Sequence, residues 1–128
     1  MGRFHKALAF LLTASFLLTS LAVRAQAQER LFGAWCDETG YRIDIGPKGI
    51  AFRDRQMGDP PAGTDLVVKD GIATYIQDFR ASQWPHIGLL NCTLRLLGDN
   101  AAAETCSGNG YGFMPFFALK RCPKEAIS

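Results

Sequence analysis

The sequence has little histidine and lacks the cysteine spacings of redox and zinc proteins. Among its 128 residues are two histidines, His5 and His86, and four cysteines with no Cys-x-x-Cys pair. The missing pair argues against a thioredoxin-type redox catalyst, and a zinc site needs cysteine spacings that are absent here. We therefore predict a protein with no bound metal and no cofactor.

The signatures of a hydrolase are also missing. A Ser-His-Asp triad would have to use His86, and no Gly-x-Ser-x-Gly turn accompanies it. Asp37 and Glu38 are adjacent, so on a strand their side chains would point to opposite faces and could not cooperate as acid and base. We predict that the protein is not an enzyme.

No long apolar run occurs after residue 27. The run from Ala7 to Val23 follows the basic residues Arg3 and Lys6 and leads into "AVRAQA", whose small residues suit a signal peptidase. We predict that residues 1–27 are a signal peptide, cleaved after Ala25 or Ala27, although the run is about as long as a short membrane anchor. Cleavage would leave a periplasmic or secreted protein with no membrane span.

Cleavage of residues 1–27 would remove the excess of positive charge. The whole chain has 14 Lys and Arg against 12 Asp and Glu; the segment removes Arg3, Lys6 and Arg24, which leaves 11 against 12, a net charge of −1. Nucleic-acid binders need a basic surface, so we expect no nucleic-acid partner. Residues 28–128 have the size of a single domain, which we predict to be monomeric.

Strand patterns dominate this domain. Alternating or apolar segments occur at 41–46, 50–55, 66–68, 72–79, 89–97, 101–106 and 113–122, and turn signals such as Asp70-Gly71 separate them. We interpret 57–65, 80–88 and 107–112 as loops, because glycine and proline interrupt the pattern. No convincing amphipathic helix is present. The pattern predicts an all-β fold, an antiparallel meander of six to eight strands that forms a small barrel or a sandwich.

The four cysteines predict two disulfides. Asp99 is the centre of the turn between two predicted strands and lies midway between Cys92 and Cys106. These two cysteines would face each other across the hairpin, which leaves Cys36 to pair with Cys122. The competing pattern, Cys36 with Cys92 and Cys106 with Cys122, stays open.

With the first pairing, "GAWC" on the first strand lies beside "LKRC" on the last. Here the chain resembles the calycin superfamily, the lipocalins and their small relatives, in which a Gly-x-Trp motif lies near a last-strand arginine. The resemblance implies a structural role for Gly33 and Trp35, with Arg121 packed across the indole. If Cys36 opposes Cys122, then Trp35 opposes Pro123 and Arg121 is its diagonal neighbour.

The segment "CSGNGYGF" contains Ser107, Gly108 and Tyr111 in the order Ser-Gly-x-x-Tyr. It resembles the inhibitory loop of periplasmic lysozyme inhibitors, whose serine reaches the catalytic carboxylates of the enzyme. Its glycines also have a purely conformational explanation, because they permit positive φ. The resemblance implies that these three residues contact a protein partner.

Two aromatic segments are further candidates for binding. "SQWPHIG" places Trp84 and His86 on a proline-stiffened loop, where tryptophan suits a binding hot spot or folds back over the barrel mouth. "FMPFFALK" contains Phe113, Phe116 and Phe117, and one of the adjacent pair points outward unless Pro115 marks a bulge.

We therefore expect a non-catalytic envelope protein that binds another macromolecule, most concretely as an inhibitor of lysozyme or of a secreted protease. The partner would be an envelope protein or a host-derived hydrolase. A carrier of small apolar ligands, as in lipocalins, and a structural envelope component are the alternatives.

Overall fold

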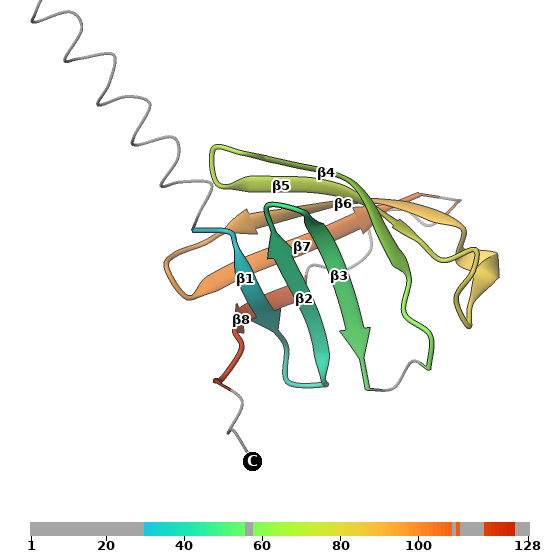
Figure 1. Ribbon diagram of the computed structural model, residues 1–128, viewed down its shortest axis with the longest axis horizontal. Coiled ribbons are helices and arrows are strands. Elements are labelled where there is room, and N and C mark those ends of the chain that lie inside the picture. The colour runs from blue at the N-terminus through green and yellow to red at the C-terminus, as the bar shows by residue number, and fades with distance from the viewer. Residues whose placement is uncertain (1–29, 56–57, 109, 111–116, 125–128) are drawn as a thin grey trace, which may run out of the picture.

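The computed structural model describes residues 30–55, 58–108, 110 and 117–124. Along these described residues, eight strands follow one another, with one short 3-10 helix between the fifth and sixth (Figure 1). The strands are β1 (Gly33–Cys36), β2 (Tyr41–Gly46), β3 (Gly49–Asp54), β4 (Ala62–Lys69), β5 (Ile72–Asp78), β6 (Leu89–Leu96), β7 (Ala101–Ser107) and β8 (Phe117–Arg121), and the 3-10 helix η1 spans Pro85–Ile87.

All eight strands belong to one antiparallel sheet with the order β3-β2-β1-β8-β7-β6-β5-β4. Because β1 pairs with β8, the sheet curls round, and its edge strands β3 and β4 meet without a ladder between their described residues (Figure 1). The result is a nearly closed barrel, which confirms the predicted all-β meander. Over the described residues, the structure contains no helix with the length and apolar character of a membrane span.

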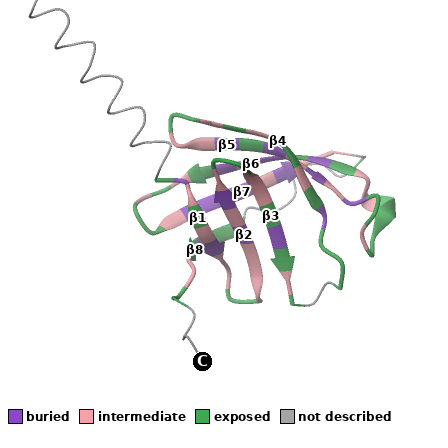
Figure 2. Ribbon diagram, in the orientation of Figure 1, coloured by how far each residue is buried: buried purple, intermediate pink, exposed green. Residues whose placement is uncertain are grey.

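Alternation along the strands separates the core from the surface (Figure 2). In β5, Ala73, Tyr75 and Gln77 are buried while Thr74 is exposed; in β6, Leu90, Cys92 and Leu94 alternate with less buried residues. This period of two follows from strand geometry, in which successive side chains point to opposite faces. The inward-facing side chains therefore form the core of the barrel.

One end of the barrel is closed by the chain that leads into β1. Trp35 is fully buried, and its indole Nε1 donates a hydrogen bond of 3.0 Å to the Leu31 carbonyl. The Arg121 guanidinium lies 3.9 Å from the Trp35 ring centroid and donates to the carbonyls of Phe32, at 2.7 Å, and Arg30. Gly33 leaves space here, because a Cβ would lie 3.0 Å from Arg121 Nη1.

Both disulfides are confirmed: Cys36 bonds to Cys122 and Cys92 to Cys106. Cys92 and Cys106 are direct partners in the β6–β7 ladder. The Cys36–Cys122 bond joins the first strand to the chain just after the last. Two disulfides in a chain of this size are compatible with an oxidising compartment outside the cytoplasm.

The predicted register of β1 and β8 is wrong by two residues. Cys36 opposes Lys120, and Trp35 opposes Arg121 directly instead of Pro123. The β8 strand ends at Arg121, so the chain can bend and bring the Cα of Cys122 to 4.9 Å from that of Cys36. The assumption that a disulfide joins directly opposed residues caused the error.

The loop predicted at 57–65 is also partly wrong, because β4 begins at Ala62. Its irregular start contains a bulge between Thr64 and Val67, with Asp65 at a φ of 54°. Gly63 lets β4 approach β3: a Cβ there would lie 2.5 Å from Ile50 Cγ2. The glycine that suggested a loop is thus needed for strand packing. At the other end of the chain, β8 begins at Phe117, and Phe113, Met114, Pro115 and Phe116 lie outside the described residues.

Candidate binding site

A pocket of about 230 Å³ opens at one end of the barrel, opposite the end that Trp35 and residues 30–32 close. The β1–β2, β3–β4 and β5–β6 connections surround it and contribute Thr39, Pro61 and Trp84 to its lining. The walls are mostly apolar, with Phe52, Phe79, Ile87, Leu90 and Phe117 among the residues that form them. Small-molecule sites in proteins commonly enclose about 300–1,000 Å³, so this pocket suits a small group.

Glu104 of β7 is the acidic residue inside the pocket. Its side chain is 2% exposed, and its carboxylate receives hydrogen bonds from three neutral donors. Tyr41 Oη donates to Oε1 at 2.8 Å, Tyr75 Oη donates to Oε2, and Gln77 Nε2 donates to Oε2 at 3.3 Å. Gln77 Nε2 also donates to Tyr41 Oη at 3.0 Å. We call these four residues the Glu104 cluster.

Burial dominates the electrostatics of the cluster. It raises the pKa of Glu104, and the hydrogen bonds from Tyr75 and Tyr41 oppose that rise. It also raises the pKa of both tyrosines, with the adjacent carboxylate adding to the effect, so both phenols stay protonated and act as donors. Over the described residues, no lysine or arginine forms an ion pair with Glu104.

The Cys92–Cys106 disulfide lies beside the cluster. The sulfur atoms and the Glu104 carboxylate are close enough to resemble a set of metal ligands. The disulfide takes up both sulfurs, so the group offers no thiolate to a metal. Instead, the covalent bond ties β7, which carries Glu104 and leads into the β7–β8 connection, to its neighbour β6.

Sequence reasoning missed the Glu104 cluster, although the signal was present. Cys106 shares a face of the hairpin with Cys92 if the predicted disulfide forms, and the alternation of Leu90, Cys92 and Leu94 turns that face inward. A residue two positions earlier on the same strand shares that face, and this residue is Glu104. The same period of two puts Gln77 beside Tyr75 on the inner face of β5.

Partly exposed aromatic side chains form the rim of the pocket. Trp84 and Phe117 are 38% and 39% exposed, and both line the opening. The Phe117 ring lies 6.4 Å from that of Tyr41, measured between centroids. Phe117 therefore faces the pocket mouth and not the outer surface. These side chains give the open end an apolar rim around a polar interior.

The predicted partner-binding residues that the structure describes lie at this same end. Ser107 is the last residue of β7 and pairs with Asn91, and Gly108 follows it with a φ of 149°. A Cβ on Gly108 would lie 2.6 Å from the Leu89 carbonyl oxygen, so glycine is required for this close approach. Trp84 immediately precedes η1 and His86 lies within it. Tyr111 lies outside the described residues.

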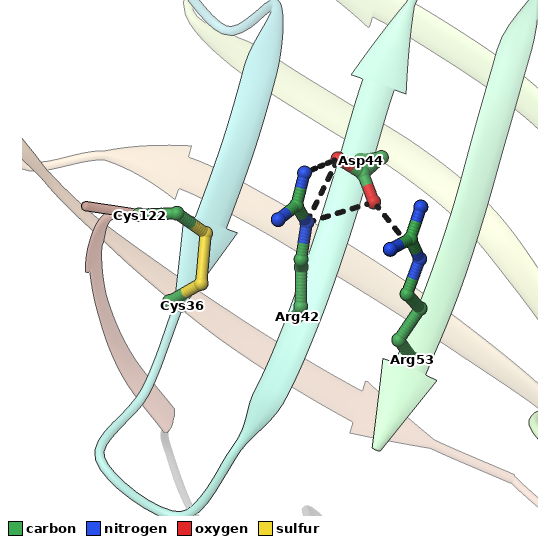
Figure 3. Close-up of polar contacts among 5 residues, drawn as sticks. All are labelled: Cys36, Arg42, Asp44, Arg53 and Cys122. Carbon is green, nitrogen blue, oxygen red and sulfur yellow. Dashed lines mark hydrogen bonds and ion pairs between the residues drawn. A yellow bond between two sulfur atoms is a disulfide. The ribbon is translucent and has the colours of Figure 1, made fainter. Parts of the chain in front are cut away.

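A separate charged cluster occupies the outer face of β2 and β3 (Figure 3). Arg42 Nη2 lies 2.9 Å from Asp44 Oδ1, and Arg53 Nε lies 3.9 Å from Asp44 Oδ2. Figure 3 shows both guanidinium groups directed at Asp44, beside the Cys36–Cys122 disulfide. Arg53 thus directs its charge along the outside of the barrel, although its side chain also borders the pocket mouth.

Comparisons with protein-family models, with curated proteins and with solved structures found no match for the chain.

Proposed function

We propose that the protein binds another macromolecule of the cell envelope through the open end of the barrel. Its most concrete form is an inhibitor of an envelope-attacking hydrolase, with lysozyme as the first candidate and a secreted protease as the second. The observation that carries this proposal is the exposed aromatic rim around the pocket, next to the Ser107–Gly108 segment.

The rim supports binding because tryptophan and other aromatic residues are enriched at interface hot spots. Trp84 and Phe117 expose more than a third of their surface at one end of a small domain. The Cys92–Cys106 disulfide holds the strand that ends at Ser107. A fixed loop base lowers the entropy cost of inserting a loop into a partner's cleft.

Lysis of peptidoglycan by a chicken-type lysozyme, with and without the oxidised protein, tests this proposal. We expect micromolar protein to slow lysis, and Ser107→Ala and Trp84→Ala to weaken inhibition by about tenfold or more, as for hot-spot truncations. Leu97→Ala is the matched control, because Leu97 is 57% exposed but lies at the β6–β7 turn, away from the pocket.

Absence of inhibition would exclude lysozyme, and the same variants would then be tested against secreted proteases. Equal loss of inhibition in Leu97→Ala and Trp84→Ala would contradict a contact at the open end. The pocket itself supports a second candidate, a carrier of a small ligand, because it offers about 230 Å³ with mostly apolar walls at the open end of the barrel. Ligand binding without any effect on a hydrolase would favour the carrier.

A further inference from the structure

The pocket contains a buried carboxyl group that has no positively charged partner within the described residues. The Glu104 carboxylate is held by two phenols and an amide, all of them neutral. Buried carboxylates are normally matched by a cation, and neutral donors offset only part of the cost of removing the charge from water. The described part of the chain supplies no cation to Glu104, and the pocket that contains Glu104 is open to solvent.

The other charged groups near the pocket do not provide the match. Asp37 and Asp54 at the mouth are acidic, and Arg53 directs its guanidinium to Asp44 on the outer face (Figure 3). Within the described part of the chain, the titratable groups that face Glu104 directly are Tyr41 from β2 and Tyr75 from β5, and both remain neutral donors. The interior of the pocket therefore holds one acidic group, Glu104, between apolar walls, and becomes negative when that group ionises.

We propose that this pocket binds a primary alkylammonium group, whose nitrogen contacts Glu104 while its carbon chain lies between the apolar walls. A cation near Glu104 completes the buried charge pair. The rings of Tyr41, Phe117 and Trp84 line the route into the pocket and favour a cation over a neutral group. The volume of about 230 Å³ accommodates a short amine or one side chain, not a larger ligand.

The hydrogen-bonding pattern selects an ammonium over a guanidinium. A guanidinium recognises a carboxylate by two parallel bonds, but both Glu104 oxygens already accept a phenol hydrogen. An ammonium is a compact charge with three donors that can go to separate acceptors. Besides Glu104, the Gln77 amide oxygen is such an acceptor, since it receives no hydrogen bond from the described part of the chain.

This chemistry has two sources, a free small amine and the lysine side chain of a partner protein. Amine binding in the pocket does not depend on the identity of any hydrolase partner. Binding is measured by calorimetry and by amide shift changes in NMR, with n-butylammonium as the probe and 1-butanol as its neutral counterpart. Nα-acetyl-lysine N-methylamide tests whether the mouth accepts a lysine that is attached to a backbone.

We expect n-butylammonium to bind at least about tenfold more tightly than 1-butanol, because a charged hydrogen bond is stronger than a neutral one. Glu104→Gln should abolish this difference. Glu38→Gln is the matched control, since it removes the same charge from an exposed turn at the same end and should leave the preference intact. Binding of both amines identifies a lysine site, and binding of n-butylammonium alone identifies a free-amine site.

A wild-type measurement keeps the inference testable if Glu104→Gln does not fold. Ammonium affinity should rise with pH as Glu104 ionises, while the affinity for 1-butanol stays constant. Near the midpoint of that rise, calorimetry in buffers of different ionisation enthalpy should detect proton release. Equal affinities for the amine and the alcohol, or an amine affinity independent of pH while the amine stays charged, would overturn the inference.

Discussion

The contact between Arg121 and Trp35 predicts a large loss of stability when the arginine is removed. The guanidinium lies 3.9 Å from the indole centroid and donates to the carbonyls of Phe32 and Arg30. A partly exposed cation–π contact contributes about 0.5–1 kcal/mol, and each hydrogen bond about 0.5–1.5 kcal/mol net. Arg121→Met should therefore lower the free energy of unfolding by about 1.5–4 kcal/mol.

Arg121→Lys separates charge from geometry. Lysine keeps a cation over the ring but has no planar fork to reach two carbonyls, so we expect about half of the loss. The measurement is urea unfolding of the oxidised protein, followed by circular dichroism. Arg95→Met is the control, because Arg95 is exposed on β6 and its removal should change stability by less than about 0.5 kcal/mol.

A loss below about 0.5 kcal/mol in Arg121→Met would refute this reasoning, since it would equal the change expected of an ordinary surface residue. The Cys36–Cys122 disulfide stays intact in these variants and continues to hold β8 near β1. The expected loss of unfolding free energy therefore reflects the lost contacts between Arg121 and residues 30–32 at the closed end. It does not reflect separation of β1 from β8.

Three further predictions concern stability. Burial raises the pKa of Glu104, so just above the ordinary glutamate pKa the native state binds more protons than the unfolded chain. The free energy of unfolding should therefore fall as pH rises through the raised pKa, and urea unfolding of Glu104→Gln should not show this fall. Gly63→Ala should lower the free energy of unfolding by about 1–3 kcal/mol, because its Cβ would lie 2.8 Å from the Ile50 carbonyl oxygen, whereas Gly46→Ala has open space and should not show this loss. Loss of the Cys36–Cys122 bond, which spans 86 residues, should cost roughly 4.6 kcal/mol by chain entropy, against roughly 3 for Cys92–Cys106, which spans 14; equal costs in selectively reduced protein would contradict that account.

Sequence periodicity was sufficient for most of the strands, and it favoured the disulfide pairing that the structure shows while a second pairing stayed open. The alternation of Tyr41, Ile43 and Ile45 located β2, and the position of Asp99 between Cys92 and Cys106 located the β6–β7 hairpin with its register. These features depend on neighbours along the chain, where the strand period of two applies directly. The long-range register of β8 against β1 lacked such a local signal, and its prediction was wrong.

The start of β4 shows a different limit. Pro60, Pro61 and Gly63 together are typical of a loop, yet Gly63 lies in a strand because Ile50 of β3 approaches it closely. Local composition cannot separate a glycine that permits a turn from one that permits contact between two backbones. That distinction requires the curvature of the barrel, which brings the two edge strands together.

Glu104 shows why the polar interior of the pocket is the part of the barrel to investigate first. A small domain is only marginally stable, and a buried carboxylate without a cation lowers its free energy of unfolding further. An apolar residue at this position would leave Tyr41, Tyr75 and Gln77 without their shared acceptor, so the four side chains form one unit. The Glu104 carboxylate accounts for Tyr41, Tyr75 and Gln77 at these positions, because all three donate hydrogen bonds to it. A cation that enters from the open end would in turn account for the carboxylate. Comparing amine binding in the wild type and in Glu104→Gln tests whether the buried carboxylate is there to bind a cation.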